Sequence, residues 1–441
     1  MEEKLLKTII DNNLIKKGDR VGVGLSGGSD SMTLISVLLN LQTKIGFELV
    51  AIHVNHNLRG EEALRDEKFV DSFCKKNNIK CIIKSVDVKN NAKNKKFTIE
   101  QSARELRYKA FEDIIKSEDL DVVALAHHQN DQAETILMHI GRGCGINGLV
   151  GMKYKSGKFI RPMLDVQKCE IESYLSENKI DFVEDSTNGV DDYKRNYVRH
   201  NLLKTFEKTY SGAVINLVKL SKFASIDEDF IQSVLPQNLV QRREDGVLLL
   251  TDAKNYHLAI ISRLIRKCLI ELNAIVDVES FHIASILDLF DLQVGKRLDM
   301  PNGVIAVKCY EGVLFKKKTI ERQENVAFGL GDFSFCGKKY RIELVKDGEI
   351  KKDKGLYFDF DKIPANVEWR NYLPDDIFTK FGGGSKKVKD YLVSKKVDSE
   401  RRKTLPCLCC ENVCLLIAGV EISEKIKVDQ ETKNVVVLYK I

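Results

Sequence analysis

The feature that most constrains the fold is a regular alternation of apolar runs and amphipathic stretches over roughly the first 200 residues. Short runs rich in Val and Ile predict strands at residues 21–26, 48–54, 81–86 and 122–127. These runs are continuous rather than alternating, so we expect the strands to be buried on both faces. Amphipathic stretches predict helices at residues 31–41, 64–77, 99–117 and 132–140. The order strand, helix, strand, helix predicts a doubly wound parallel α/β sheet, which binds ligands beyond the carboxyl ends of its strands.

The remainder of the chain shows two further patterns. From about residue 201 to 285 the apolar period becomes 3.6, as in Leu258–Leu272, and predicts a small helical domain. From about residue 295 onward short strand-like runs return. A length of 441 residues allows two to four domains. We therefore predict a catalytic α/β domain, a helical domain and a mixed α+β C-terminal domain, at residues 1–205, 206–294 and 295–441.

Composition narrows the function classes. A net charge of +6 permits a nucleic-acid partner without demanding one. The sequence has no run of about 18 apolar residues and no secretory signal pattern, so we expect no membrane association and a cytoplasmic location. The cysteines number 11, an odd count that favours thiols over disulfides in that compartment.

The segment Ser26-Gly27-Gly28-Ser29-Asp30-Ser31 follows the first predicted strand and opens a helix. A helix start of this kind binds anions, since its free N–H groups and the helix dipole converge there. The two glycines let the backbone approach a phosphate, the serines add hydroxyl donors, and Asp30 suits a bridging divalent cation. A plain Gly/Ser turn is the alternative, but the preceding strand and the full six residues favour a phosphate site. The segment is neither a Walker A motif nor a dinucleotide fingerprint.

Further motifs accompany this segment over about residues 15–205. They are His53–Gly60, Ala103–Tyr108, Ala126–Thr135, Arg142–Leu149, Arg161-Pro162, residues 184–188, and Arg195-Asn196 with Arg199. Together they resemble the tRNA(Ile)-lysidine synthetase family of the PP-loop ATP pyrophosphatase superfamily.

The resemblance implies an ATP-dependent ligase. The wobble cytidine of tRNA(Ile) with a CAU anticodon would be adenylated by ATP with Mg²⁺, and L-lysine would then displace AMP to give lysidine. The resemblance thus implies ATP, Mg²⁺, tRNA and lysine as ligands, with residues 206–294 and 295–441 as tRNA-binding domains, and a homodimer is a further expectation.

Several residues have two interpretations. Arg104 and Arg107 share one helix face, which suits either a polyanion or solvated surface charge; the resemblance implies a catalytic role at ATP. Asp131 and Glu134 could share a metal ion or an ammonium group, although Asp131 could simply cap a helix. The resemblance places His127 and Asp131 in the catalytic pocket, with Asp30 and Asp131 as metal ligands and His127 as a candidate base.

Other candidates concern substrate contacts. His53 is predicted to line the pocket near adenine or ribose; with His56 it could form a metal pair, but no third ligand follows at suitable spacing. Arg195 and Arg199 form a basic pair, and the resemblance implies that they contact the nucleotide or tRNA, with Glu134 also assigned to substrate. A basic run at residues 386–403 predicts tRNA phosphate contacts, with a solvated surface as the alternative. Its candidate residues are Lys386, Lys387, Arg401 and Arg402.

Two rival functions remain open from the sequence. A PP-loop tRNA thiolase acting on cytidine would need a cysteine pair or an iron–sulfur cluster near the loop, yet Cys74, Cys81, Cys144 and Cys169 contain no C-x2-C spacing. A non-catalytic RNA-binding protein would not need the intact Ser26–Ser31 segment. Cys407 and Cys410 do have C-x2-C spacing, but they lie in apolar runs where free cysteine commonly packs.

Overall fold

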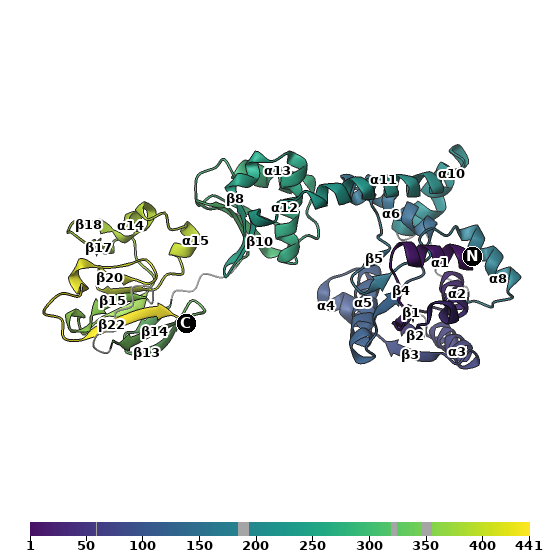
Figure 1. Cartoon of the computed structure of the whole chain (residues 1–441), viewed down its shortest axis with the longest axis horizontal. Coiled ribbons are helices and arrows are strands. Elements are labelled where there is room, and N and C mark those ends of the chain that lie inside the picture. Colours follow the sequence, from purple (N-terminus) through teal and green to yellow (C-terminus); the bar gives the residue numbers. More distant parts are fainter. Residues whose placement is uncertain (59, 184–193, 319–323, 346–354) are drawn as a thin grey trace. The chain divides into compact units, whose positions relative to one another are not determined.

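The computed structural model describes residues 1–58, 60–183, 194–318, 324–345 and 355–441. It comprises two compact units, residues 1–230 and 231–441 (Figure 1). Two parts of the motifs named above, Arg59 and residues 184–188, lie outside the described residues.

The first unit contains a six-stranded sheet in the order β3-β2-β1-β4-β6-β5. All neighbouring strands are parallel except β5, which runs antiparallel to β6 at one edge. This arrangement confirms the doubly wound parallel sheet. The strands are β1 (Arg20–Gly24), β2 (Glu48–Asn55), β3 (Lys80–Ser85), β4 (Val122–Ala124), β5 (Lys155–Ser156) and β6 (Phe159–Ile160).

Helices cover both faces of this sheet. The helices up to residue 233 are α1 (Glu2–Asp11), α2 (Ser29–Ile45), α3 (Glu61–Lys76), α4 (Val88–Lys95), α5 (Ile99–Ser117), α6 (Gln129–Gly141), α7 (Ile146–Leu149), α8 (Lys168–Glu177), α9 (Lys194–Tyr197), α10 (Lys204–Thr209) and α11 (Ala213–Ser233), with a π-helical segment at Val198–Leu203. The four helices expected from the sequence correspond to α2, α3, α5 and α6. α5 begins at a capping box between Thr98 and Gln101, which fixes where the helix starts.

The residues of the central strand β1 pack against helices on both faces of the sheet. Val21 and Val23 are fully buried in the core shared with α1, α2 and α8. Gly22 faces the other way, where a Cβ would stand 2.9 Å from Ile52 Cδ1. Gly24 likewise lies against the ring of Phe111 from α5. The glycines therefore let α5 and its neighbours pack close to the sheet, next to the loop that follows β1.

One burial prediction is wrong. The strand expected at residues 81–86 was to be buried on both faces, but β3 is an edge strand whose residues are exposed or half-buried. An edge strand has a neighbour on one side only, and its Val/Ile content does not reveal that position.

The second unit begins with a mixed region. Helices α12 (Leu258–Glu271) and α13 (Ser280–Leu289) confirm the helical stretches expected there. They pack on a five-stranded antiparallel sheet in the order β7-β8-β11-β10-β9. Its strands are β7 (Val240–Arg243), β8 (Gly246–Leu250), β9 (Arg297–Asp299), β10 (Val304–Lys308) and β11 (Gly312–Lys317).

This sheet crosses the predicted boundary between residues 294 and 295. β8 pairs with β11 in register from Gly312 opposite Leu250 to Phe315 opposite Val247. The β7–β8 hairpin is not evident in the sequence, because only its second strand is apolar. Residues 206–294 therefore do not form an all-helical domain, since their core depends on strands that follow residue 295.

The C-terminal part is the expected mixture of strands and helices. One sheet has the order β12-β16-β19-β20-β17-β18 with β21 on β20, and a second has the order β13-β14-β22-β15. Trp369 and Phe358 are fully buried in the core between them. The elements are β12 (Asn325–Ala327), β13 (Gly331–Phe335), β14 (Lys338–Leu344), β15 (Leu356–Asp359), β16 (Glu368–Arg370), β17 (Ile377–Thr379), β18 (Ser385–Lys387), α14 (Val388–Ser394), α15 (Ser399–Arg402), β19 (Cys407–Cys410), β20 (Val413–Ile417), β21 (Glu421–Ile422) and β22 (Val435–Lys440).

Among the described residues, no helix is both long and apolar enough to cross a membrane.

Candidate active site

The loop between β1 and α2 is built to hold an anion. Gly27 has φ = +92°, a backbone conformation that favours glycine. Gly28 is the N-cap of α2 and offers no side chain to the first N–H groups of the helix, which have no acceptor within it. The Ser31 hydroxyl braces the loop by donating to Gly28 O (3.0 Å) and accepting from Ser26 N (3.2 Å). The loop therefore presents backbone donors at the positive end of a helix dipole.

This loop lies where the strand order reverses. From β1 the chain passes through α2 to β2 on one side, whereas β4 lies on the other side of β1. Open α/β sheets bind ligands at such a switch point. The segment that follows β4 and the segment that follows β2 therefore converge on the loop, as the sequence predicted.

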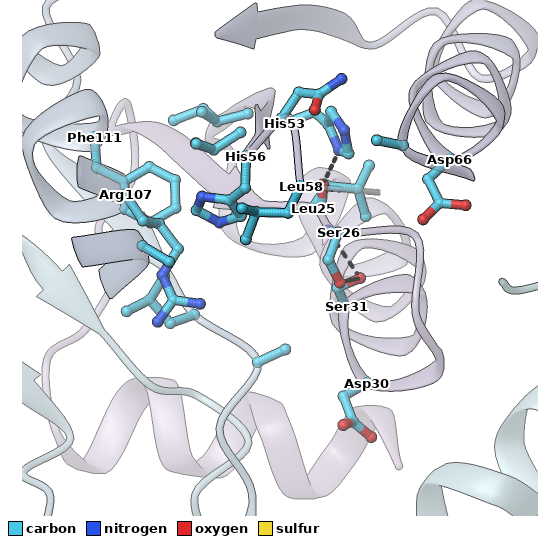
Figure 2. Close-up of a pocket in the computed structure, with 18 of the residues that line it drawn as sticks. Leu25, Ser26, Asp30, Ser31, His53, His56, Leu58, Asp66, Arg107 and Phe111 are labelled. Atoms are coloured by element: carbon cyan, nitrogen blue, oxygen red, sulfur yellow. Dashed lines mark hydrogen bonds between the residues drawn. The ribbon is translucent and has the colours of Figure 1, made fainter. Parts of the chain in front are cut away.

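A cavity of about 550 Å³ opens beside the loop on the β2 side (Figure 2). Its wall combines apolar side chains with a few polar groups, a composition typical of small-molecule sites. His53 is held by a hydrogen bond between its Nδ1 and Leu25 O (2.9 Å). The predicted site residues that line this cavity are Ser26, Asp30, Ser31, His53, Arg107, His127 and Asp131.

A second cavity of about 690 Å³ meets the first at the loop. The two share Ser26, Asp30 and Ser31. The wall of the second is more highly charged, because α6, α8 and the π-helical segment contribute to it. Its other predicted site residues are Gly28, Ser29, Glu134 and Arg199.

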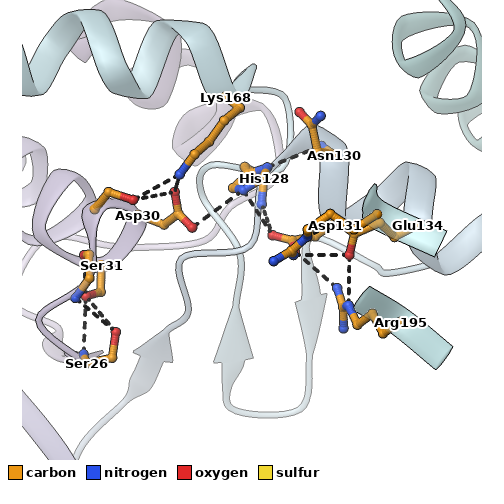
Figure 3. Close-up of polar contacts among 12 residues, drawn as sticks. Ser26, Asp30, Ser31, His128, Asn130, Asp131, Glu134, Lys168 and Arg195 are labelled. Carbon is orange, nitrogen blue, oxygen red and sulfur yellow. Dashed lines mark hydrogen bonds and ion pairs between the residues drawn. The ribbon is translucent and has the colours of Figure 1, made fainter. Parts of the chain in front are cut away.

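Asp30 lies between the side chains of Lys168 and His128 (Figure 3). Its Oδ1 accepts a hydrogen bond from Lys168 Nζ at 2.6 Å, and its Oδ2 lies 3.6 Å from His128 Nε2. Burial would raise the pKa of Asp30, but His128 and Lys168 outweigh it and hold that pKa well below its usual range. Asp30 is thus an anion at any physiological pH.

His128 links the two predicted metal ligands. Its Nδ1 accepts the N–H of Asn130 and caps α6, while its Nε2 lies 3.5 Å from Asp131 Oδ2. Burial opposes a positive charge on this ring, but the carboxylates of Asp131 and Asp30 raise the pKa of His128 above its ordinary value.

Asp131 and Glu134 share cations, as their spacing suggested, but the cations are guanidinium groups. Asp131 Oδ1 lies 3.1 Å from Arg195 Nη2 and 3.0 Å from Arg199 Nη2. Glu134 is fully buried and pairs with Arg195 at 2.9 Å and with Arg199 at 2.5 Å. The structure thus binds Arg195 and Arg199 to carboxylates, whereas the resemblance implied contact with nucleotide or tRNA.

The two candidate metal ligands differ in how well they fit a cation. Asp30 is one partly exposed carboxylate beside an anion-binding loop, and Mg²⁺ typically takes one or two carboxylates together with phosphate oxygens. Asp131 Oδ1 is held by two arginines, and its Oδ2 accepts the backbone N–H of His128 at 3.0 Å. Asp30 therefore fits a metal ion better, since the ion would displace the Lys168 ammonium and the neighbouring His128, whereas Asp131 would have to release two arginines and a backbone N–H.

His127 has a different environment from His128. Its Nδ1 is buried and has no hydrogen-bond partner among the described residues. Burial, helped by Arg161, Arg195 and Arg107 against the attraction of Asp131, lowers the pKa of His127 to about 3. The ring is neutral near pH 7, and so low a pKa makes it a weak proton acceptor.

We expect His127 to make folding stability dependent on pH. The unfolded chain protonates this imidazole near pH 6.5 and the folded chain only near pH 3, so stability falls as the pH drops through that window. Between pH 8 and pH 5 this loss amounts to about 2 kcal/mol. His127→Gln removes this titratable group. Urea unfolding at pH 8 and pH 5 should therefore show that the wild type loses about 2 kcal/mol more unfolding free energy between the two pH values than the variant does. Equal losses in the two proteins would contradict this pKa.

The two arginines on α5 are not equivalent. Arg107 lines the first cavity, and burial lowers its pKa. Arg104 is exposed, lies with its guanidinium 5.1 Å from the centre of the Tyr108 ring, and is not among the residues that line the two cavities. The shared helix face predicted from their spacing thus brings only Arg107 to the cavity wall.

Two residues of the site were not predicted from the sequence. His128 stood inside a quoted motif but was assigned no role. Lys168 is the first residue of α8, and its 138-residue separation from Asp30 hid the contact. The position of Lys168 is one sequence signal for a functional role, because the helix dipole disfavours a lysine in the first turn of a helix.

The basic residues expected to contact RNA lie in the second unit. Lys386 and Lys387 are exposed on β18, and Lys387 pairs with Asp375 at 3.0 Å. Arg401 is exposed and Arg402 half-buried on α15. Cys407, Cys409 and Cys414 are buried in the adjoining core, in strands β19 and β20 as expected.

Comparison with known proteins places the chain in a family. Residues 1–206 match the model of the PP-loop domain, and residues 367–439 match the model of the TilS substrate C-terminal domain. The tRNA(Ile)-lysidine synthase of Clostridium perfringens is 36% identical over 99% of this chain and 98% of its own length. The enzyme of the same name from Caldanaerobacter subterraneus is 32% identical over 99% and 97% of the two chains, and that from Bacteroides thetaiotaomicron 30% identical over the whole of both. The chain belongs to the tRNA(Ile)-lysidine synthase family.

Proposed function

We propose that this protein uses ATP to join L-lysine to the wobble cytidine of tRNA(Ile) with a CAU anticodon. The observation that carries the proposal is the Ser26–Ser31 loop at the switch point of the sheet, in a chain of this family. In the first step the 2-carbonyl oxygen of cytidine attacks the α-phosphate, and pyrophosphate leaves. In the second step the ε-amine of lysine attacks the activated carbon, and AMP leaves with the electrons of the carbon–oxygen bond.

The nucleoside of ATP would occupy the first cavity. His53 would line the adenosine site, and Arg107 would bring positive charge to the α-phosphate, where it offsets the charge that develops in the transition state. The polyphosphate would cross the N-terminus of α2, where Gly27, Gly28 and Ser29 leave the backbone accessible.

We infer that Mg²⁺ assists this step at Asp30. The metal ion would neutralise phosphate charge and orient the leaving group. Asp131 is the second candidate ligand, once Arg195 and Arg199 are displaced from it.

We infer that lysine approaches through the second cavity. Glu134 lines this cavity and Asp131 lines the first, and both already bind guanidinium groups, so they suit the ammonium of the amino acid. Arg195 and Arg199, once released, would contact the nucleotide or the tRNA. Because the pKa of His127 is about 3, its expected role as a base depends on a rise in pKa when substrates bind.

The tRNA would also contact the second unit. Lys386, Lys387, Arg401 and Arg402 supply charge for phosphate contacts, which position an RNA without reading its sequence. The homodimer and the cytoplasmic location remain predictions.

We expect Arg107→Ala to lower kcat/KM for ATP by about 30-fold or more, whereas Arg104→Ala lowers it less than about 5-fold. A guanidinium in the cavity wall stabilises charge far better than one exposed to water. Steady-state pyrophosphate release by the two variants measures the difference. Equal effects would contradict the placement of ATP in this cavity.

Omission assays test the reaction itself. Release of AMP from ATP should require both lysine and the tRNA, and one lysine should be consumed for each AMP. Release that requires a sulfide donor and no lysine would instead indicate the thiolase, and absence of ATP cleavage with intact RNA binding would indicate the non-catalytic protein.

A further inference from the structure

We propose that Lys168 binds the pyrophosphate leaving group and stabilises the charge that it gains. The inference rests on the proposed use of ATP by this loop and adds a residue to it. Three observations carry it: where Lys168 is anchored, what it contacts, and which of the two cavities it lines.

The backbone of Lys168 is fixed by the first unit. α8 packs on α2 through Ile171, Tyr174 and Leu175, which are buried in the shared core. The start of the helix is held by Glu170, whose carboxylate accepts the N–H of Gln167 at 2.8 Å. An anchored stem limits the positions that its ammonium can reach.

The position is unfavourable for a lysine on local grounds. Lys168 is the first residue of α8, where the helix dipole disfavours a cation by about 0.3–1 kcal/mol. Residues that contradict local preference often serve a site. Its Nζ extends to the start of another helix, 2.6 Å from Asp30 Oδ1 and 2.9 Å from Ser29 Oγ (Figure 3). Both partners belong to the anion-binding loop.

The arrangement of the two cavities indicates which part of ATP the Lys168 ammonium would contact. Lys168 lines the second cavity and is not among the residues that line the first. With the nucleoside in the first cavity, the polyphosphate chain runs over the shared residues Ser26, Asp30 and Ser31 toward the second. The distal phosphates, which become pyrophosphate, therefore arrive beside Lys168.

A positive charge beside the leaving pyrophosphate would assist the cleavage of ATP. When the bond between the α-phosphorus and its bridging oxygen breaks, the electron pair stays on pyrophosphate and its negative charge rises. A fixed ammonium favours that state over bound ATP and transfers no proton. A metal ion at Asp30 would neutralise the carboxylate that holds Lys168 and so leave the ammonium to the phosphates.

Lys168→Met tests the assignment in the full-length chain. With Mg²⁺ present, we expect the Kd for pyrophosphate to rise about 10- to 100-fold and the Kd for AMP to change less than twofold. Lys168→Arg should recover part of the pyrophosphate affinity, because it keeps the charge with a different shape. Calorimetry with inorganic pyrophosphate and with AMP measures both constants.

Lys4→Met is a matched control, because Lys4 of α1 also forms an ion pair close to the start of α8. Lys4 pairs with Glu170 of α8 at 2.6 Å, and both side chains are as exposed as Lys168 and Asp30. It should bind both ligands like the wild type. Unchanged pyrophosphate affinity in Lys168→Met, or equal weakening for AMP and pyrophosphate, would overturn the proposal, since a merely structural lysine predicts those results. If Lys168→Met does not fold, Lys168→Gln is judged by the same two constants.

The test separates this inference from the proposed function. A wild-type protein that binds pyrophosphate and AMP but shows no lysine-dependent ATP cleavage would refute the proposed function. The pyrophosphate Kd of Lys168→Met would then still decide whether Lys168 binds pyrophosphate. Normal lysine-dependent turnover with undiminished pyrophosphate affinity in Lys168→Met would refute only the inference.

Discussion

Replacing Asp30 with Asn should lower the rate of pyrophosphate release by about 10³-fold, which corresponds to about 4 kcal/mol of transition-state stabilisation. The substitution keeps the size of the side chain and removes the charge that suits a metal ion. Because the pKa of Asp30 lies far below neutrality, the wild-type side chain carries its charge throughout pH 6 to 9, so a large loss should be present over that whole range. Single-turnover measurements at saturating ATP isolate this step.

Asp71→Asn is the control for that experiment. Asp71 pairs with Lys75 at 2.6 Å on the surface of α3, outside both cavities, so its activity should match the wild type. If Asp30→Asn retained more than about a tenth of the wild-type rate, Asp30 would not be the metal ligand of this reaction.

Replacing Glu134 with Ala should destabilise the fold by about 2–4 kcal/mol. The Glu134 side chain is fully buried and compensates Arg195 and Arg199, whose side chains are 27% and 37% exposed. Its loss leaves a cavity and two guanidinium groups with Asp131 as their remaining common partner. The exposure of the arginines keeps the expected loss below that of a fully buried pair. Urea unfolding measures the change.

Two comparison variants show whether charge or volume is responsible. Glu134→Gln keeps the volume and should cost less than Ala. Asp71→Ala breaks an exposed pair and should cost at most about 0.5 kcal/mol. A loss for Glu134→Ala as small as that for Asp71→Ala would show that the four-residue ion network is not a stabilising element.

Much of the first unit was predictable because its signals are local. Continuous Val/Ile runs predicted β1, β2 and β4, and the 3.6 period predicted α5 to the residue. The Ser26–Ser31 loop combined a strand, two glycines and a helix start, so the anion site followed from adjacent residues. β3 shows the limit, since its sequence resembles a central strand while its edge position depends on the order of the whole sheet.

The contacts that the sequence did not predict join distant segments. Lys168 meets Asp30 across 138 residues, and Arg199 meets Glu134 across 65. Spacing showed that Asp131 and Glu134 could share a cation, but only the tertiary structure identifies Arg195 and Arg199 as that cation. The pairing of β8 with β11 joins distant segments in the same way, since Val247 lies opposite Phe315.

The most direct test of the proposed reaction is mass spectrometry of the tRNA after incubation with the protein, ATP and lysine. The account predicts that the wobble cytidine of tRNA(Ile) with a CAU anticodon gains one lysine, with one AMP and one pyrophosphate released for each. A tRNA in which that cytidine is replaced by uridine should gain nothing. An unmodified cytidine in the presence of ATP cleavage, or the gain of sulfur in place of lysine, would contradict the account.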